Sequence, residues 1–558
     1  IRGGHDALGQ RLNDVGRLAK RMRQRRGVVV AVATPTAGVD HVAAVGPARV
    51  MPKLHHFAVH VEELVELHFV PLEEPKVAGG VGVFPAEGQP GFPHSLESNA
   101  FDGMAGGIEH FHFGIQRRFT AGGIDFQNPL FTRVGLKTEE ILIGSLGVAI
   151  DGAGDFSWGS VWLGEHGKLT QVAHFPHVYS IGLLYSAITI YLGFKPSRHE
   201  GKVLGLAAYG NPEPLLSRLL AETNPKNWGQ LFSAKLARVT LGFHNELGQS
   251  VVAQLCAGLA KEDIAAGIQA FTEQLICDWV QEQVQALKVN KLALAGGVFA
   301  NVKLNQRILA LPDVDNIYVH PNMGDGGLAT GAAYEVYAQL ENGWTPVFNE
   351  QVYLGTEINR SNALQALETK GIKYTEPAAL ACEVAQLLAD GKVVARADGK
   401  MEYGPRALGN RTVMASCHDK SINQWLNEKF SRTEFMPFAP VILESEAQAY
   451  FPDWQAEHIA AQFMTLTYNA SELAQQNIPA AVHIDGTARP QVLARENNPD
   501  YFDIIAEYQK ITGIPSVINT SFNMHEEPIV RTAAEAITAF QSADLDALIL
   551  GPFLVLKC

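Results

Sequence analysis

The chain has 558 residues, of which 47% are apolar and 18% charged, a composition typical of globular proteins with material for more than one core. Its 44 Lys/Arg and 58 Asp/Glu residues give a formal net charge of −14, which disfavours nucleic acid as a partner. Five cysteines without a CxxC pair argue against a disulfide scaffold or a zinc ribbon. They fit a reducing compartment, so we expect a cytoplasmic protein.

Residues 1–140 lack an apolar period long enough to predict regular elements, apart from a possible helix near 60–68. This segment is rich in His and Gly, and the chain begins at Ile1 rather than Met. We therefore interpret 1–140 as an atypical, irregular segment. It is either an artefact of the gene model or a replacement of an ordinary lobe.

Regular elements are predicted from about residue 141. A strand is expected over 141–151, a hairpin over 157–175 and a helix over 180–194. The uncharged run 177–194 contains Tyr, Ser and Thr and is shorter than the roughly 20 apolar residues of a spanning helix. We expect it to be buried in the protein, with no membrane as a partner.

A long amphipathic helix is predicted over 261–287, because Ile264, Ile268, Phe271 and Leu275 fall on one face. The pattern strand, glycine turn, helix then occurs twice in succession. Its elements are strand 291–295 with helix 301–309, and strand 316–319 with helix 328–340. This order is typical of α/β proteins.

Residues 341–357 are predicted to be a linker, which divides 141–345 from a further α/β domain at 358–558. In that domain short strands and helices alternate. Strands are expected at 392–399, 437–443, 514–523 and 547–556, and helices at 378–391, 422–430, 500–513 and 532–542.

Paired glycines between a strand and a helix let backbone N–H groups approach a phosphate. Such turns contain Gly296 and Gly297, followed by Asn301, and then Gly324, Gly326 and Gly327. Glycine turns also occur without any ligand, so nucleotide binding is one of two interpretations. Asp325 is either a helix cap or a ligand of a divalent cation beside a phosphate.

Basic and amide side chains gather around Gly/Pro turns in 358–558. They are Lys400, Arg406, Arg411, Arg489, Asn519, Ser521 and Asn523. Such a set fits a phosphorylated substrate, or else surface arginines paired with Glu402, Glu428 and Glu434. In SRHEGKVLGLAAYG (197–210), Lys202 is either near a phosphate or part of a surface ion pair.

These motifs together resemble the O-carbamoyltransferase family that acts on antibiotics and nodulation factors. The resemblance covers about 146–556 and rests on VAIDGAGD, GFKPSRHEGKVLGLAAYG, LAGGVFANVKLN, HPNMGDGGLATGAAY, KMEYGPRALGNR, FMPFAP, HIDGTARPQ and INTSFN. It implies an actin/Hsp70-like (ASKHA) α/β domain, similar to the tRNA threonylcarbamoyl transferase, followed by a YrdC-like α/β domain.

The resemblance implies that the second domain forms carbamoyl-adenylate from carbamoyl phosphate and ATP. The first domain would then transfer the carbamoyl group to an acceptor hydroxyl. Lys400, Arg406, Arg411 and Arg489 would neutralise phosphates, and Asn519, Ser521 and Asn523 would hold the nucleotide and carbamoyl group. Gly296, Gly297, Gly326 and Gly327 would line the adenylate site of the first domain. A divalent metal, iron or magnesium, would sit on Asp151, Asp325 and an HxxxH pair of histidines.

The expected histidine pair is absent from the residues just upstream of Asp151. His56 and His60 have the right spacing but lie far from it, so an incidental pair is the alternative. Two other functions remain open: a half-active or non-catalytic nucleotide-binding relative, and tRNA modification of the threonylcarbamoyl type. The acceptor and the oligomeric state cannot be predicted from the sequence.

Overall fold

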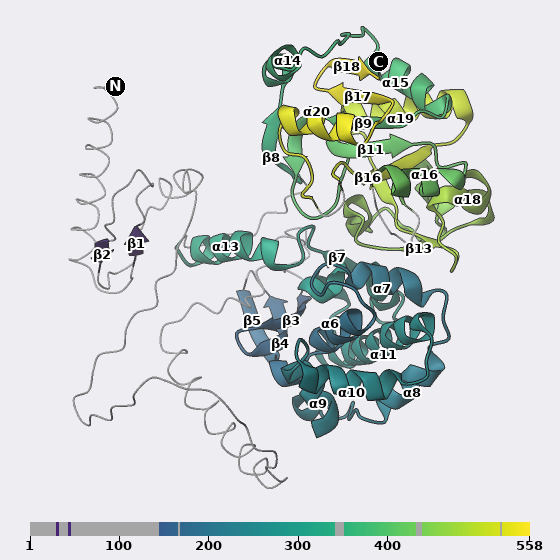
Figure 1. The fold of residues 1–558 in the computed structure, drawn as a ribbon. Helices are drawn as coiled ribbons and strands as arrows, with labels where there is room; N and C mark the ends of the chain where they lie inside the picture. Colours follow the sequence, from purple (N-terminus) through teal and green to yellow (C-terminus); the bar gives the residue numbers. More distant parts are fainter. Residues whose placement is uncertain are drawn as a thin grey trace, which may run out of the picture. The chain divides into compact units, whose positions relative to one another are not determined.

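In the computed structural model, the described residues are 144–165, 168–340, 351–430, 438–524 and 527–557, together with β1 (Val30–Val32) and β2 (Ala43–Val45) (Figure 1). Residues 1–122 and 123–558 form separate units. In the first unit, β1 and β2 pair antiparallel. The rest of the segment 1–140, with its candidate histidines, lies outside the described residues.

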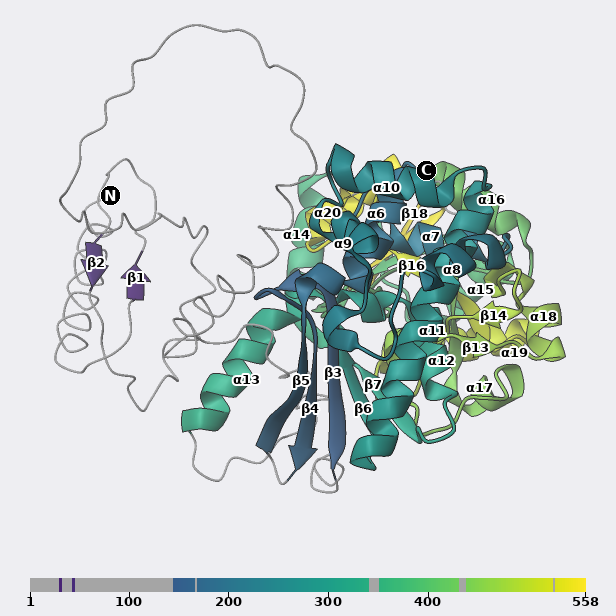
Figure 2. The same ribbon diagram turned by 90° about the horizontal axis from the view of Figure 1, so that it is seen from below.

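The first half of the second unit is built on a five-stranded sheet of order β5-β4-β3-β6-β7. Figure 2 shows these strands side by side. They are β3 (Ser145–Gly154), β4 (Ser157–Glu165), β5 (Lys168–Pro176), β6 (Lys291–Ala295) and β7 (Asn316–Val319). The strands β3, β4 and β5 form an antiparallel meander, whereas β6 and β7 run parallel to β3. The predicted hairpin and the predicted strands 291–295 and 316–319 are confirmed.

Eight α-helices accompany this sheet in the described part of the chain. They are α6 (Ile181–Tyr191), α7 (Glu200–Ala207), α8 (Glu213–Leu220), α9 (Ala234–Leu241), α10 (Glu246–Cys256), α11 (Lys261–Leu287), α12 (Val302–Leu309) and α13 (Leu328–Leu340). The long helix α11 packs against α6, α7, α8 and α12. Its Trp279 meets Phe175 of β5 edge-on at 5.2 Å between ring centroids, which joins helix and sheet in one core.

The second half contains a mixed seven-stranded sheet of order β15-β12-β16-β11-β9-β17-β18. Its strands are β9 (Val394–Ala397), β11 (Arg411–Ala415), β12 (Ala439–Leu443), β15 (Gln491–Leu493), β16 (Ser516–Ser521), β17 (Ala547–Leu550) and β18 (Phe553–Leu556). Two small sheets pair β8 (Tyr353–Ile358) with β10 (Gly399–Glu402), and β13 (Tyr468–Asn469) with β14 (Thr487–Ala488).

The helices of this half are α14 (Arg360–Thr369), α15 (Leu380–Ala389), α16 (Ser421–Lys429), α17 (Glu444–Tyr450), α18 (Glu472–Asn477), α19 (Pro499–Thr512) and α20 (Ala533–Ser542). Helices and sheets thus alternate in both halves, and the predicted α/β class is confirmed. The exact domain boundaries at 141–345 and 358–558 stay predictions.

Two predicted elements are wrong in detail. The run 547–556 is a hairpin of β17 and β18 rather than one strand, because the chain turns at Gly551 with φ +57°. The last residues of the predicted linker 341–357 belong to β8.

The uncharged run 177–194 forms a short 3₁₀ turn and α6. Within the described residues, no helix combines the length and apolarity that a membrane crossing requires.

Candidate functional site

The carboxyl ends of β3, β6 and β7 gather the first group of predicted site residues. Asp151 lies near the end of β3, Gly296 and Gly297 follow β6, and the turn 324–327 follows β7. The N–H of Gly296 donates to the carbonyl of Met323 at 2.6 Å, which ties the two glycine turns together. Ligands of open α/β sheets bind at the carboxyl ends of the strands. The residues predicted for the adenylate and the metal therefore lie where such ligands bind.

The Asp151 carboxylate accepts N–H bonds from Gly152 at 2.6 Å and from Gly297 at 2.9 Å. Burial raises the pKa of Asp151, the two backbone bonds lower it, and the negative charge of Asp325 raises it again, with a net rise. The two aspartates are therefore close enough to repel each other. A cation between them would relieve that repulsion, so both side chains fit a divalent metal.

The described residues supply only part of such a metal site. None of them form a group of three or more His, Cys, Asp or Glu side chains that could hold an ion. Asp151 and Asp325 are thus two of the four implied ligands. The candidate histidines lie outside the described residues, and the metal stays a prediction.

Close packing explains why some of the predicted nucleotide-binding positions are glycine. A Cβ on Gly296, where φ is +99°, would lie 2.0 Å from the carbonyl oxygen of Ile150. A Cβ on Gly326 would meet the Asn322 side chain at 2.6 Å, whereas the space around Gly324 is open. The backbone of β3 beside Gly296 and the Asn322 side chain beside Gly326 explain these two glycines without a ligand.

Asn301 has a structural role in these contacts. Its Oδ1 accepts the N–H of Leu304 at 3.0 Å and caps α12, and its Nδ2 donates to Gln269 at 2.9 Å. Asn301 thus joins α12 to α11, and its nucleotide contact stays a prediction.

A cleft of about 600 Å³ brings together six predicted site residues from both halves of the unit. They are Lys202, Arg406, Arg489, Asn519, Ser521 and Asn523. Arg198, His199 and Glu527 also line it. Lys202 was predicted to lie either near a phosphate or in a surface ion pair. It is buried and lines this cleft together with Arg406 and Arg489 of the second half.

The cleft is strongly basic in an acidic chain. Its described lining contains four Lys/Arg side chains (Arg198, Lys202, Arg406 and Arg489) and one carboxylate, Glu527. Burial lowers the pKa of Arg406 to about 10. Burial and the positive charge of Arg406 also lower the pKa of Arg489.

Arg406 and Arg489 are half-buried, and one polar atom of each lacks a partner among the described residues. The Nε atoms of Arg406 and Arg489 are shielded from solvent and have no hydrogen-bond partner there. Two guanidinium groups that repel each other in a partly desolvated cleft form a favourable site for an anion, and phosphate matches their geometry.

The loop that carries Arg406 is held by Glu402, a role that the sequence did not reveal. One Glu402 carboxylate oxygen accepts the N–H groups of Leu408, Asn410 and Arg411 at 2.8–2.9 Å. The available signal is an acidic residue just before the Gly404-Pro405 turn, but from the sequence alone it predicts only a surface partner of arginine.

Asn519 connects this loop to the seven-stranded sheet. Its Nδ2 donates to the carbonyl of Ala407 at 3.0 Å and to the Gln491 side chain at 2.7 Å. Nδ2 of Asn523 donates to the Met524 and Glu527 carbonyls at 2.9 and 2.8 Å. These bonds fix the wall of the cleft. The side-chain amides of Asn519 and Asn523, which were predicted to hold the nucleotide and carbamoyl group, therefore have a structural role.

Arg411 and Lys400 are not in the cleft. The fully buried Arg411 donates to the carbonyls of Asp398, Asn410, Thr356, Gly399 and Arg531 at 2.8–3.3 Å. Lys400 is exposed on β10. The two terminal nitrogens of Arg411 are used by these carbonyls, and its Nε is buried without a partner among the described residues. The predicted phosphate contact does not fit a side chain that is buried outside the cleft.

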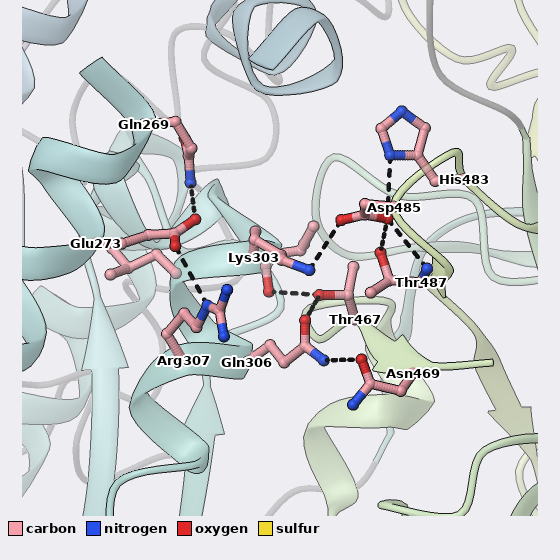
Figure 3. Close-up of polar contacts among 12 residues, drawn as sticks. Gln269, Glu273, Lys303, Gln306, Arg307, Thr467, Asn469, His483, Asp485 and Thr487 are labelled. Carbon is pink, nitrogen blue, oxygen red and sulfur yellow. Dashed lines mark hydrogen bonds and ion pairs between the residues drawn. The ribbon is translucent and has the colours of Figure 1, made fainter. Parts of the chain in front are cut away.

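A second, smaller cavity of about 270 Å³ adjoins the cleft and shares Arg489 and Phe438 with it. Figure 3 shows the polar seam beside it. Lys303 of α12 donates to Asp485 at 2.9 Å, and Thr467 donates to Gln306 at 2.9 Å. The seam joins α12 to the segments around β13 and β14.

Comparison with known proteins identifies the family. The model of the carbamoyltransferase N-terminus matches 143–334, and that of the carbamoyltransferase C-terminus matches 385–557. The chain belongs to the carbamoyltransferase family. It is therefore an enzyme, a carbamoyltransferase that acts on small-molecule substrates.

Three relatives illustrate the similarity. The nodulation protein NolO of Bradyrhizobium diazoefficiens is 33% identical over 427 residues, which are 74% of this chain and 75% of the relative. An uncharacterized protein of Methanocaldococcus jannaschii is 33% identical, over 73% of this chain and 69% of its own length. Nodulation protein U of Sinorhizobium fredii is 34% identical over 50% of this chain and 48% of its own length.

Among solved structures, full-length HypF in a phosphate- and nucleotide-bound form aligns with 33% of this chain and 22% of its own. The identity is 15% and the TM-score 0.22, values too low to support a statement about this chain.

Proposed function

We propose that the protein is an ATP-dependent O-carbamoyltransferase that forms carbamoyl-adenylate in the basic cleft. The observation that carries the proposal is the lining of that cleft: four Lys/Arg side chains and one carboxylate in a chain of net charge −14. Such a cleft attracts phosphorylated substrates, and both carbamoyl phosphate and ATP are of that class.

The first stage balances with one water molecule. Water cleaves carbamoyl phosphate into carbamate and phosphate. A carbamate oxygen then attacks the α-phosphorus of ATP, the bond to the β-phosphate oxygen breaks, and pyrophosphate leaves with the electron pair. Arg406 and Arg489 would neutralise the negative charge that gathers in this step, and Ser521 would contribute a neutral hydrogen bond.

The second stage transfers the carbamoyl group. The acceptor hydroxyl oxygen attacks the carbamoyl carbon, the bond to AMP breaks, and the hydroxyl proton goes to a base. We place this stage at the carboxyl ends of β3, β6 and β7, where Asp151 and Asp325 lie. A divalent cation held by the two aspartates, iron or magnesium, would acidify the acceptor hydroxyl.

Pyrophosphate release tests the proposal. We expect purified protein to release pyrophosphate from ATP only when carbamoyl phosphate is present. Arg489→Gln and Arg406→Gln should each lower the rate about 10²-fold or more, because each removes a charge from the reacting phosphates. The matched control is Arg495→Gln, which alters an exposed arginine paired with Asp503 in the same half. Release that does not depend on carbamoyl phosphate, or that survives both cleft variants, would refute the proposal.

A further inference from the structure

The basic residues of the cleft come equally from the two halves of the unit. Arg406 and Arg489 belong to the half built on the seven-stranded sheet, whereas Arg198 and Lys202 belong to the half built on the five-stranded sheet. Lys202 is 8% exposed, which is unusual for a lysine without a functional or structural reason. The cleft is therefore assembled from both halves.

The segment 197–202 is held firmly by its own half. The Glu200 carboxylate accepts the N–H of Ser197 at 2.7 Å and the hydroxyl of Ser186 on α6 at 2.8 Å. The helix α7 that begins at Glu200 packs against α11. Glu200 thus fixes the first turn of α7, and the segment presents Arg198 and Lys202 to the cleft on a rigid support.

ATP and carbamoyl phosphate together carry more negative charge than two guanidinium groups can neutralise. ATP and carbamoyl phosphate must occupy the cleft together, and negative charge accumulates on pyrophosphate as it leaves. Arg406 and Arg489 lie close enough to repel each other, so they define one anionic subsite. Arg198 and Lys202 face them from the opposite half and are suited to a second subsite in the same cleft.

We propose that Lys202 and Arg198 bind the phosphate chain of ATP and neutralise pyrophosphate as it departs, so that the first half of the enzyme completes the adenylate-forming site of the second. This inference rests on the proposed function. When the bond between the α-phosphorus and the bridging oxygen breaks, the electron pair remains on pyrophosphate, and the two cations of α7 and its preceding loop stabilise that charge.

The test uses full-length Lys202→Gln and Arg198→Gln variants. Titration of each with inorganic pyrophosphate should show a dissociation constant at least about tenfold higher than that of the parent. In carbamoyl-phosphate-dependent pyrophosphate release, kcat should fall and the KM for ATP should rise. Lys202→Arg and Arg198→Lys should restore much of both, because they keep the charge. The matched control is Lys261→Gln, at an exposed position at the start of α11 that lines neither cavity.

The outcomes separate the two proposals. If Arg489→Gln loses pyrophosphate release while Arg198→Gln and Lys202→Gln behave like the parent, the composite site is refuted and the proposed function stands. If all of these variants behave like the parent, both fail. Because Lys202 is buried, its variant can fail to fold. Arg198 is exposed, so Arg198→Gln then decides the question.

Discussion

Two arginines five residues apart, Arg406 and Arg411, have opposite roles in this enzyme. Arg406 lines the cleft, whereas the side chain of Arg411 is buried among backbone carbonyls. The motif KMEYGPRALGNR identified both, but its spacing could not separate them. Their directions depend on how the loop after β10 folds over Glu402 and on the position of Arg411 inside the sheet.

Arg411→Ala is expected to destabilise the protein rather than remove activity selectively. The substitution leaves buried carbonyl groups without their charged donor, so the free energy of unfolding should fall by about 3 kcal/mol or more. Denaturant unfolding at pH 7 measures this, with Arg495→Ala as the surface control, expected within about 0.5 kcal/mol of the parent. A variant as stable as the parent but inactive would show that Arg411 contacts substrate after all.

Among the elements, the loop after β10 and the turn after β7 meet at a tight contact. Tyr403 Oη lies 3.2 Å from His320 Nε2 and 2.9 Å from Thr330 Oγ1. A Cβ on Gly404, where φ is +115°, would lie 2.5 Å from the carbonyl oxygen of Pro321. The loop bearing Arg406 is thus packed on the turn that leads to Asp325.

Gly404→Ala should therefore displace Arg406 and raise the KM for carbamoyl phosphate. The control is Gly371→Ala, because Gly371 also has a positive φ, +63°, but has open space where the Cβ would go. Gly371→Ala should lose about 1–2 kcal/mol of stability from backbone strain, and Gly404→Ala should lose more because its Cβ also meets the Pro321 carbonyl oxygen. Steady-state kinetics should show the KM effect in Gly404→Ala alone; an equal effect in both would mean that the contact with Pro321 does not position the loop.

The polar seam gives a prediction for pH. Although burial opposes it, hydrogen bonds from His483, Thr487 and Lys303 and the charge of Lys303 hold the pKa of Asp485 well below its ordinary value. A depressed carboxyl pKa stabilises the fold above the unfolded-state pKa of about 3.9, and this stabilisation is lost as the pH falls below that value.

Asp485→Asn should consequently lower the free energy of unfolding by about 1–3 kcal/mol at pH 7. The difference from the parent should stay constant down to about pH 5 and shrink below about pH 4. Unfolding curves at a series of pH values measure it, and Asp503→Asn is the control for an exposed pair. A difference that shrinks near pH 6 would assign the effect to a histidine instead.

The helices and strands could be predicted from the sequence to different degrees. The strands beside the glycine turns and the long helix α11 were found because their apolar patterns are long and regular. Helices α8, α9 and α10 were missed, although Ser233 and Asn245 are good N-caps for two of them. They are only 8–11 residues long, so few apolar repeats mark them.

At the scale of the whole molecule, the sequence located the motifs but not their partnership. Lys202 is far from Arg406 and Arg489 along the chain, and no local pattern shows that α7 faces the second half. The grouping depends on tertiary contacts such as those of Lys303 with Asp485 and Gly404 with Pro321. The motifs therefore contain six of the residues that line the cleft, and only the fold shows that these six lie together.

The basic cleft of an acidic chain has a kinetic consequence. At about 0.01 M ionic strength the screening length is roughly 30 Å, so an approaching nucleotide experiences the repulsion of the whole surface. At about 0.15 M it is roughly 8 Å, and only the cleft's own attraction remains. Stopped-flow measurements should thus find that moderate salt accelerates the association of ATP, whereas a basic protein would show slower association. Slower association with added salt would mean that the cleft's field dominates even at long range.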